Sequence, residues 1–427
     1  MINSTYCGLQ LKKGERTSIE MINKKYDVII VGGGASGFFT AISLAEQNTD
    51  LKIAILERGK EVLSKVRISG GGRCNVTHAC FIPNLLTKYY PRGERELRGP
   101  FHTFCTGDVI EWFEQKGIEL KTEEDGRMFP VTDSSQTIID CFVSEAKKLD
   151  IEVIQSCSVQ HIFQNAEQWK LDTTQGAFLT ENLVLATGSN PKVWEILAGL
   201  NHEIIPPVPS LFTFNIKDSR IKELMGLSVE QVTVKVANSK LKATGPLLIT
   251  HWGMSGPAVL RLSAWGARDL SEMKYRFQVH INWLNDKTFD DTLQELLTLK
   301  ETHAKKNISK FSPFPIPGRL WEQLVVAAGI SLDTKWSDTN KKQLVHLTHQ
   351  LTDGVFSVDG KSTFKEEFVT AGGVDLKQIN FKTMESKLFH NLYFTGEIIN
   401  IDAITGGFNF QNAWTTGFIA AQAIANK

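Results

Sequence analysis

The sequence predicts an α/β protein in which a doubly wound sheet domain is interrupted by an inserted domain. Three observations lead to this fold class. Residues 26–56 follow the order strand, glycine turn, helix and strand, the α/β alternation weakens between residues 206 and 365, and a buried-strand pattern returns at 391–394. A βαβ unit of this kind has a right-handed crossover and builds a parallel sheet.

Each element follows from the spacing of apolar residues. The continuous apolar runs at 26–31 and 51–56 suit strands buried on both faces, and the helix between them covers 35–47. Asp133 is the expected N-cap of a helix at 134–149. The other expected helices cover 108–116, 291–300, 341–351 and 412–425. The other expected strands cover 151–162, 183–186, 229–236, 275–281 and 391–394.

The chain is long enough for two or three domains, because single hydrophobic cores rarely grow beyond about 250 residues. Pro206, Pro207 and Pro209 mark the main boundary, since closely spaced prolines break both helix and sheet. The inserted domain is expected to open with strands and to close with helices. The expected division is a disordered leader at 1–24, a first part of the sheet domain at 25–205, the β-rich and helical insert at 206–365, and a last part of the sheet domain at 366–427.

Composition narrows the class of protein. Lys and Arg together number 47, as do Asp and Glu, so the net charge is zero and gives no support for a nucleic-acid partner. No apolar run approaches the ~20 residues that span a bilayer, so no membrane association is expected. The six cysteines include no Cys-x-x-Cys pair, which argues against a dithiol redox centre or a zinc site and suits a reducing, cytoplasmic compartment.

A glycine-rich motif lies between the first predicted strand and helix. Residues 32–37, GGGASG, fit the G-x-G-x-x-G pattern of dinucleotide-binding turns. Gly32 permits the tight turn, Gly34 lets the backbone approach a pyrophosphate, and Gly37 allows the helix to pack closely on the sheet. Glu57 follows 20 residues after Gly37, at the end of the second strand, where a carboxylate accepts hydrogen bonds from ribose hydroxyls.

Three further segments carry glycines and polar residues near predicted strand ends. Residues 65–75, KVRISGGGRCN, form a flexible loop of N–H donors with positive charge nearby. Residues 183–189, LVLATGS, bring a buried strand end close to a ligand. Residues 393–411, YFTGEIINIDAITGGFNFQ, supply carboxylates and a glycine pair before a helix. Because the carboxyl ends of the strands of a doubly wound sheet line one crevice, these segments are expected to meet at one ligand.

Together with THWGMSGPAVL at 250–260, TAGGV at 370–374 and TMESK at 383–387, these motifs resemble the HI-0933-like, or BaiN/YhiN-type, bacterial flavoproteins, which include aminoacetone oxidase-like members. The resemblance covers residues 26–427. It implies a FAD-binding domain of glutathione-reductase type with a β-rich and helical insert. The cofactor contacts that motifs and resemblance together imply are Gly32, Gly34, Ala35, Ser36, Gly37, Glu57, Arg58, Lys65, Ser69, Gly70, Gly71, Gly72, Arg73, Cys74, Asn75, Val159, Ala186, Thr187, Gly188, Gly396, Glu397, Asp402, Gly406, Gly407, Phe408, Asn409 and Gln411.

The chemistry leaves three functions open. The first is a reductase that uses FAD and NADH or NADPH to reduce a small organic acceptor, such as a conjugated carbonyl, through flavin N5. No second G-x-G-x-x-G unit follows Gly188, so a nicotinamide would bind in the open cleft. The second is a flavin amine oxidase that uses dioxygen. The third is a non-catalytic flavoprotein that binds RNA or protein, against which the zero net charge weighs.

Two residues are candidates for a part in catalysis. His251, in the THWGMSGP segment, is the one residue of the insert singled out as a proton donor, although a lone histidine is usually structural. Cys74 follows the glycine run that is expected to border the flavin. A lone cysteine is more often a small buried hydrophobe than a nucleophile, so the catalytic interpretation of Cys74 is a minority view.

Overall fold

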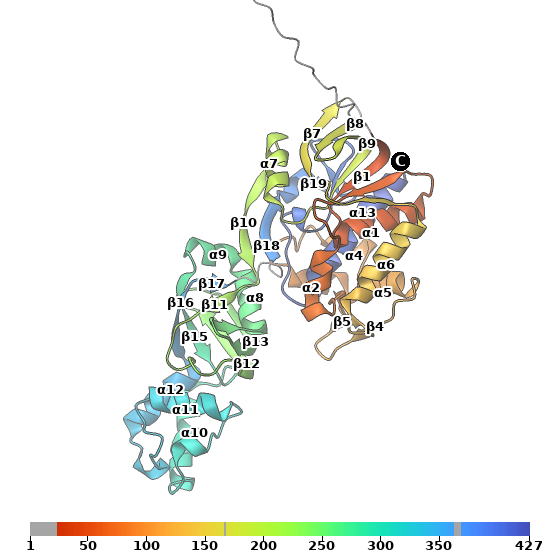
Figure 1. Ribbon diagram of the computed structural model, residues 1–427. Coiled ribbons are helices and arrows are strands. Elements are labelled where there is room, and N and C mark those ends of the chain that lie inside the picture. Colours follow the sequence, from red (N-terminus) through yellow and green to blue (C-terminus); the bar gives the residue numbers. More distant parts are fainter. Residues whose placement is uncertain (1–23, 166–167, 363–368) are drawn as a thin grey trace, which may run out of the picture.

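The computed structural model describes residues 24–165, 168–362 and 369–427. Two hydrophobic cores organise these residues. The buried residues of the first core lie within 26–197 and 374–424, with Ala264 added, and those of the second lie within 212–358. Figure 1 shows the result as an elongated molecule, with the part that holds both ends of the described chain above and the intervening part below it.

A nine-stranded sheet forms the centre of the first part. Its parallel strands are β1 (Lys24–Val31), β2 (Ile53–Leu56), β6 (Glu152–Ile154), β9 (Gly176–Leu185) and β21 (Leu392–Phe394). They lie in the order β21-β9-β1-β2-β6, so the first and last thirds of the chain share one sheet. Because the strands are parallel, the loops that follow β1, β9 and β21 meet at one edge of the sheet.

Antiparallel strands extend this sheet. They are β7 (Val159–Asn165), β8 (Gln168–Thr173), β19 (Ile379–Asn380) and β20 (Glu385–Ser386). The single strand expected at 151–162 was wrong, since the chain turns at Ser156, whose φ of 55° lies in the left-handed region. β6 therefore pairs with β2, whereas β7 joins the sheet through β8 and β9.

Three long helices pack together against this sheet. They are α1 (Ala35–Gln47), α6 (Ser135–Lys148) and α13 (Phe408–Ala425). The expected N-cap of α6 was wrong: the helix begins at Ser135, one residue later than expected, so Ser134 is the N-cap and accepts a hydrogen bond from the Gln136 N–H. The Asp133 carboxylate instead pairs with Lys121. α13 begins four residues earlier than expected, inside the glycine-rich segment itself.

Smaller elements surround the three helices. A three-stranded sheet consists of β3 (Thr77–His78), β5 (Arg127–Pro130) and β4 (Leu120–Thr122). The accompanying short helices are α2 (Ser64–Gly72), α3 (Pro83–Leu86), α4 (Arg98–Thr103), α5 (Thr106–Glu114) and α7 (Pro191–Gly199). No helix of the described residues is long and apolar enough to cross a membrane.

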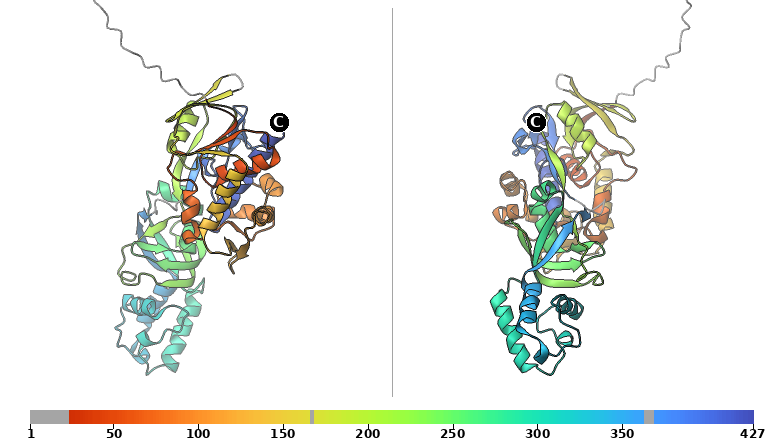
Figure 2. Two further views of the ribbon diagram at one scale, coloured as in Figure 1. Left: turned by 45° about the vertical axis from the view of Figure 1, so that its right-hand side comes forward. Right: turned by 90° about the vertical axis from the view of Figure 1, so that its left-hand side faces the viewer.

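A two-stranded ribbon joins the two parts of the molecule, as Figure 2 shows from two further sides. β10 (Ile204–Ser210) pairs with β18 (Val369–Val374) in antiparallel register. The prolines expected to break the sheet are therefore inside a strand. The ribbon tolerates them because its register shifts between Ile205 and Val208, and Pro206 and Pro207 face solvent there.

The intervening part contains a seven-stranded antiparallel sheet. Its strands are β11 (Thr213–Asn215), β12 (Ser228–Val236), β13 (Lys242–Ile249), β14 (Gly253–Ser255), β15 (Arg276–Asn282), β16 (Gly354–Asp359) and β17 (Lys361–Ser362). Its helices are α8 (Pro257–Trp265), α9 (Ala267–Glu272), α10 (Phe289–Thr302), α11 (Gly318–Ala327) and α12 (Lys341–Thr352). The insert does not close with helices, because β16 returns to pair with β15 after α12.

Candidate cofactor and substrate site

A cavity of about 620 Å³ opens at the carboxyl edge of the parallel strands. Its walls come from the loops after β1, β2, β9 and β21, from α2 and from the insert. Four sequence segments that are distant along the chain therefore meet, as expected. The predicted residues that line the cavity are Gly32, Gly34, Ala35, Ser36, Glu57, Arg58, Lys65, Ser69, Gly70, Gly71, Asn75, Ala186, Thr187, Gly188, Gly396, Glu397, Gly406, Gly407 and Asn409.

The glycine turn after β1 contains two glycines with different roles. A side chain at Gly32 would place Cβ 2.4 Å from the Ala186 carbonyl oxygen, and its φ is +115°. This position therefore serves the close approach of β1 and β9. A Cβ at Gly34 would meet nothing within 4 Å. Gly34 therefore faces open space. It is also the N-cap residue of α1, and no side chain accepts hydrogen bonds from the first N–H groups of this helix. These N–H groups remain available to an anion.

Backbone donors orient the Glu57 carboxylate at the end of β2. Its Oε2 accepts a hydrogen bond from the Gly33 N–H at 2.8 Å, and its Oε1 accepts one from the Gly59 N–H at 2.7 Å. Each carboxylate oxygen can accept a further hydrogen bond. The side chain is thus held at the cavity wall and can still receive ligand hydroxyls.

A smaller pocket of about 130 Å³ adjoins the cavity. It shares Gly32, Glu57, Arg58 and Thr187 with the cavity, and it reaches Val159 at the start of β7. Val159 therefore lies near the predicted ribose end of the site and not in the main cavity.

An ion pair joins two motifs across the cavity. The Lys65 ammonium of α2 lies 2.7 Å from Glu397 Oε2, and Glu397 Oε1 accepts a hydrogen bond from the Thr370 N–H of β18. The residues after Lys65 do not form a regular helix, since Ser69 is extended and Gly70 and Gly71 are left-handed. The loop expected at 65–75 therefore begins only after a short helical turn, and its Ser69, Gly70 and Gly71 line the cavity.

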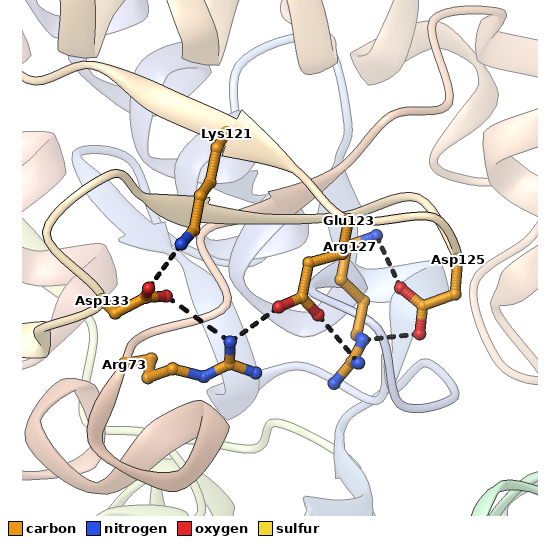
Figure 3. Close-up of polar contacts among 6 residues, drawn as sticks. All are labelled: Arg73, Lys121, Glu123, Asp125, Arg127 and Asp133. Atoms are coloured by element: carbon orange, nitrogen blue, oxygen red, sulfur yellow. Dashed lines mark hydrogen bonds and ion pairs between the residues drawn. The ribbon is translucent and has the colours of Figure 1, made fainter.

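Arg73 does not line the cavity. Its guanidinium lies 2.6 Å from Glu123 Oε1 and 3.5 Å from Asp133 Oδ1 (Figure 3). The same guanidinium also lies over the Phe129 ring. Lys121 pairs with the same Asp133 carboxylate, and this hydrogen bond lowers the pKa of Asp133. Two acidic neighbours thus hold the arginine expected at the cofactor.

Arg127 lines the cavity instead, although its sequence position gave no signal of a site. Its Nη2 lies 2.9 Å from Glu123 Oε2 and its Nε lies 2.7 Å from Asp125 Oδ2 (Figure 3). Glu123 therefore bridges Arg73 and Arg127, and the six residues of Figure 3 balance three positive with three negative charges.

Asp402 was expected at the ribityl chain, yet it does not line the cavity. It is fully buried and forms a two-point ion pair with Arg92, while Ser210 donates a hydrogen bond to Oδ2 at 2.8 Å. Burial raises the pKa of Asp402 in spite of these partners. The carboxylate joins the C-terminal loop to the ribbon strand β10.

The remaining predicted residues outside the cavity wall are Gly37, Gly72, Cys74, Phe408 and Gln411. Cys74 is completely buried, and burial raises the pKa of its thiol to about 12. Gln411 accepts a hydrogen bond from Thr77, and Phe408 stacks on Tyr89 with ring centroids 4.2 Å apart. Their side chains hold α13 against the rest of the first part.

The insert supplies a wall that the sequence did not predict. Leu211, Thr213, Ser255, Leu260 and Ser362 line the cavity from the insert side. The only signal was the glycine-rich THWGMSGPAVL segment, which contains two of them. His251, the candidate drawn from that segment, is an exposed residue in a bend and does not line the cavity.

Two polar atoms at the cavity fit a polar ligand. Thr187 Oγ1 and Asn412 Oδ1 are buried and have no hydrogen-bond partner among the described residues. Both residues line the cavity. Buried polar atoms normally find a partner, so these two indicate a ligand with hydrogen-bonding groups. With the open face of Gly34 and the oriented Glu57, the donor set suits a dinucleotide.

A family model described as HI0933-like protein Rossmann domain matches residues 26–423. The chain belongs to this family. A ribosomal RNA dihydrouridine synthase of Escherichia coli K12 is 28% identical over 93% of this chain and 98% of its own. A 3-dehydro-bile acid delta(4,6)-reductase of Clostridium scindens is 24% identical over the same shares.

The fold has a counterpart among solved structures. The 3-ketosteroid delta1-dehydrogenase of Sterolibacterium denitrificans superposes with a TM-score of 0.51 at 10% identity, over 95% of this chain and 100% of that chain. Family, fold and site together identify this HI0933-like protein as an FAD-dependent oxidoreductase. The expected family, fold class and FAD chemistry are confirmed.

Proposed function

We propose that this protein reduces a carbon–carbon double bond conjugated to a carbonyl group, with NADH or NADPH as the source of electrons. The observation that carries the proposal is the shared cavity: its sheet-domain wall suits FAD, and residues of the insert line the same cavity, where an acceptor would meet the cofactor. Bound FAD would supply the redox chemistry, taking a hydride from one substrate and passing it to the other.

Different residues of the sheet domain would contact successive parts of FAD. Gly34 and the N-terminus of α1 would face the pyrophosphate, and Glu57 would accept hydrogen bonds from the adenosine ribose. Val159 and the smaller pocket would hold the adenine. Lys65 and Glu397 would border the ribityl chain and flavin.

The C-terminal glycine loop would lie against the flavin ring. Gly406 and Gly407 precede α13, whose N-terminus carries the positive end of the helix dipole. Asn409 fixes this loop through two hydrogen bonds with Ala403, one from its side-chain N–H₂ and one to its side-chain oxygen. A positive helix end at this place would stabilise negative charge on a reduced ring.

The names of the two relatives support the type of reaction. Dihydrouridine is uridine in which a ring C=C bond conjugated to a carbonyl has been reduced. A delta(4,6)-reductase of a 3-dehydro-bile acid likewise acts on C=C bonds that are conjugated with a carbonyl, the 3-oxo group. Both reactions add two electrons and two protons to an activated double bond. The shared chemistry is therefore proposed for this chain, with a small organic acceptor as its substrate.

A uracil ring within RNA is the second candidate acceptor. The hydroxyl groups of Thr213, Ser255 and Ser362 favour an acceptor rich in heteroatoms, and the E. coli relative is named for such a base. The zero net charge, which led us to expect no nucleic-acid partner, favours the small acceptor.

An anaerobic absorbance experiment tests the proposal. The purified protein should show oxidised flavin bands that bleach within seconds after NADH or NADPH is added. Cyclohex-2-enone, a steroid 4-en-3-one and a uridine-containing ribosomal RNA transcript are then added separately. Return of the bands with one of them identifies the acceptor class. Flavin that ignores both nucleotides, with peroxide formed from aminoacetone in air, would replace the proposal by an amine oxidase.

A further inference from the structure

Three hydroxyl side chains of the insert form one polar surface of the cavity, here called the hydroxyl wall: Thr213, Ser255 and Ser362. Ser255 is on β14, Thr213 is on the neighbouring strand β11, and Ser362 is on β17 beyond it. Thr213 is the direct cross-strand partner of Ser362 in the register of β11 and β17. Their common position on one end of the insert sheet therefore follows from strand pairing and not from sequence proximity.

The hydrogen bonds within this wall leave one donor unused. Thr213 Oγ1 donates to Ser255 Oγ at 3.0 Å, and Ser362 Oγ donates to Asn215 Oδ1 at 2.8 Å. Two hydroxyls that share one hydrogen bond always retain one O–H, whichever of them donates. Among the described residues no acceptor receives the O–H of Ser255, so it is available to a molecule in the cavity.

The surroundings of this free donor suit an oxygen that gains negative charge. Ser255 stands two residues before α8, so the positive end of that helix dipole lies next to it. Leu211 and Leu260 line the cavity beside the wall and supply apolar contact. A donor among apolar groups interacts more strongly with charge than it would in water.

We propose that the hydroxyl wall, through the Ser255 O–H, binds the carbonyl oxygen of the acceptor and stabilises the enolate that forms during reduction. The inference rests on the proposed function. Hydride addition to the β-carbon breaks the C=C π bond and moves one electron pair onto the carbonyl oxygen. A proton from water then adds to the α-carbon, the electron pair returns, and the saturated carbonyl is released.

This assignment gives Thr213 a positioning role. Its hydroxyl donates to Ser255 Oγ and so turns the remaining Ser255 O–H away from β11. Thr213 is itself almost completely buried. In this proposal Thr213 orients the Ser255 hydroxyl and does not itself bind the acceptor, so its removal should leave the Ser255 donor present but less well oriented.

The test compares Ser255→Ala and Thr213→Val with Thr244→Val. Thr244 shares a hydroxyl pair with Thr233 at 2.9 Å in the same insert sheet, outside the cavity lining, and is the matched control. Reoxidation of the reduced holoenzyme by cyclohex-2-enone should slow about 100-fold in Ser255→Ala and by less in Thr213→Val. Flavin reduction by NADPH should stay within about twofold in all three variants.

A binding measurement separates this inference from the proposed function. The phenolate of 4-chlorophenol mimics an enolate oxygen, and its binding is followed by the change in flavin absorbance of the oxidised holoenzyme. We expect Ser255→Ala to bind it at least about 10-fold more weakly than the wild type and Thr244→Val to bind it equally. If the reduced enzyme does not react with enones, the proposed function is overturned, but the phenolate titration still tests whether the hydroxyl wall binds a negatively charged oxygen.

Two results would overturn the hydroxyl wall. One is equal phenolate affinity in the wild type, Ser255→Ala and Thr244→Val. The other is a Ser255→Ala variant that loses reduction by NADPH but keeps reoxidation by the enone, since this would place Ser255 at the nicotinamide and not at the acceptor.

Discussion

Arg92 and Asp402 lie 310 positions apart and form a two-point ion pair in which the carboxylate is fully buried. Arg92 Nη1 also donates to the Ala264 carbonyl oxygen at the end of α8, and Ser210 of β10 donates to the same Asp402. One ion pair thus links the sheet domain, the ribbon and the insert beside the cavity. The relative position of the sheet-domain wall and the insert wall of the cavity therefore depends on an ion pair whose carboxylate is buried.

Arg92→Ala should destabilise the protein by about 3–5 kcal/mol, because it leaves the Asp402 carboxylate buried without its counter-charge. The measurement is the free energy of unfolding from urea titration. Arg276→Ala is the matched control, since the Arg276–Asp359 pair is about three-quarters exposed and should contribute less than about 1 kcal/mol.

The same variant should depend on pH in a defined direction. Burial already raises the pKa of Asp402, and loss of Arg92 should raise it further. Protonation removes the unpaired charge, so the deficit of Arg92→Ala should shrink as the pH falls from 8 to 5. A deficit that is constant over this range would show that lost packing, and not the charge, causes it.

Two glycine substitutions in the turn after β1 should separate folding from cofactor binding. Gly34→Ala adds a methyl group in open space, so the fold should persist while affinity for FAD falls at least about 10-fold. Gly32→Ala places Cβ against the Ala186 carbonyl at a positive φ and should destabilise the fold itself. Thermal unfolding of the apoprotein and FAD titration by fluorescence quenching distinguish the two, and equal FAD affinity in Gly34→Ala would remove the pyrophosphate assignment.

Cys74 should be inert in the folded protein. Its thiol is buried and its pKa is raised to about 12, so almost no thiolate exists at pH 8. Mass spectrometry after treatment with iodoacetamide should find Cys74 unmodified under native conditions and modified in urea. Rapid native alkylation with loss of turnover would restore the minority view that Cys74 takes part in catalysis.

His202 should make the protein sensitive to acid. It is buried against Ser386, and burial lowers its pKa to about 4. The unfolded chain takes up this proton near pH 6.5, so the stabilising contribution is present above that pH and lost as the pH falls toward 4. The loss should amount to about 3 kcal/mol. His202→Phe should flatten the pH dependence of unfolding, and an unchanged slope would assign the acid sensitivity to other groups.

Local patterns of the sequence determined much of the cofactor side. β1, α1 and β2 form where apolar spacing placed them, and Glu57 lies at the predicted strand end, because a strand–turn–helix–strand unit depends on residues close in the chain. Other expectations were wrong because of interactions between residues that are distant in the chain. Arg73 pairs with Glu123 and Asp133, and Asp402 pairs with Arg92, and only the folded chain brings these charges together.

The sequence by itself determined the family, the fold class and the motifs that surround a dinucleotide. The tertiary structure decided which members of those motifs reach the cavity, that Arg127 replaces Arg73 at its wall, and that Thr213, Ser255 and Ser362 face it from the insert. The physical reason is that a motif records backbone conformation over a few residues. A cavity wall is set by strand register and by the docking of segments hundreds of residues apart.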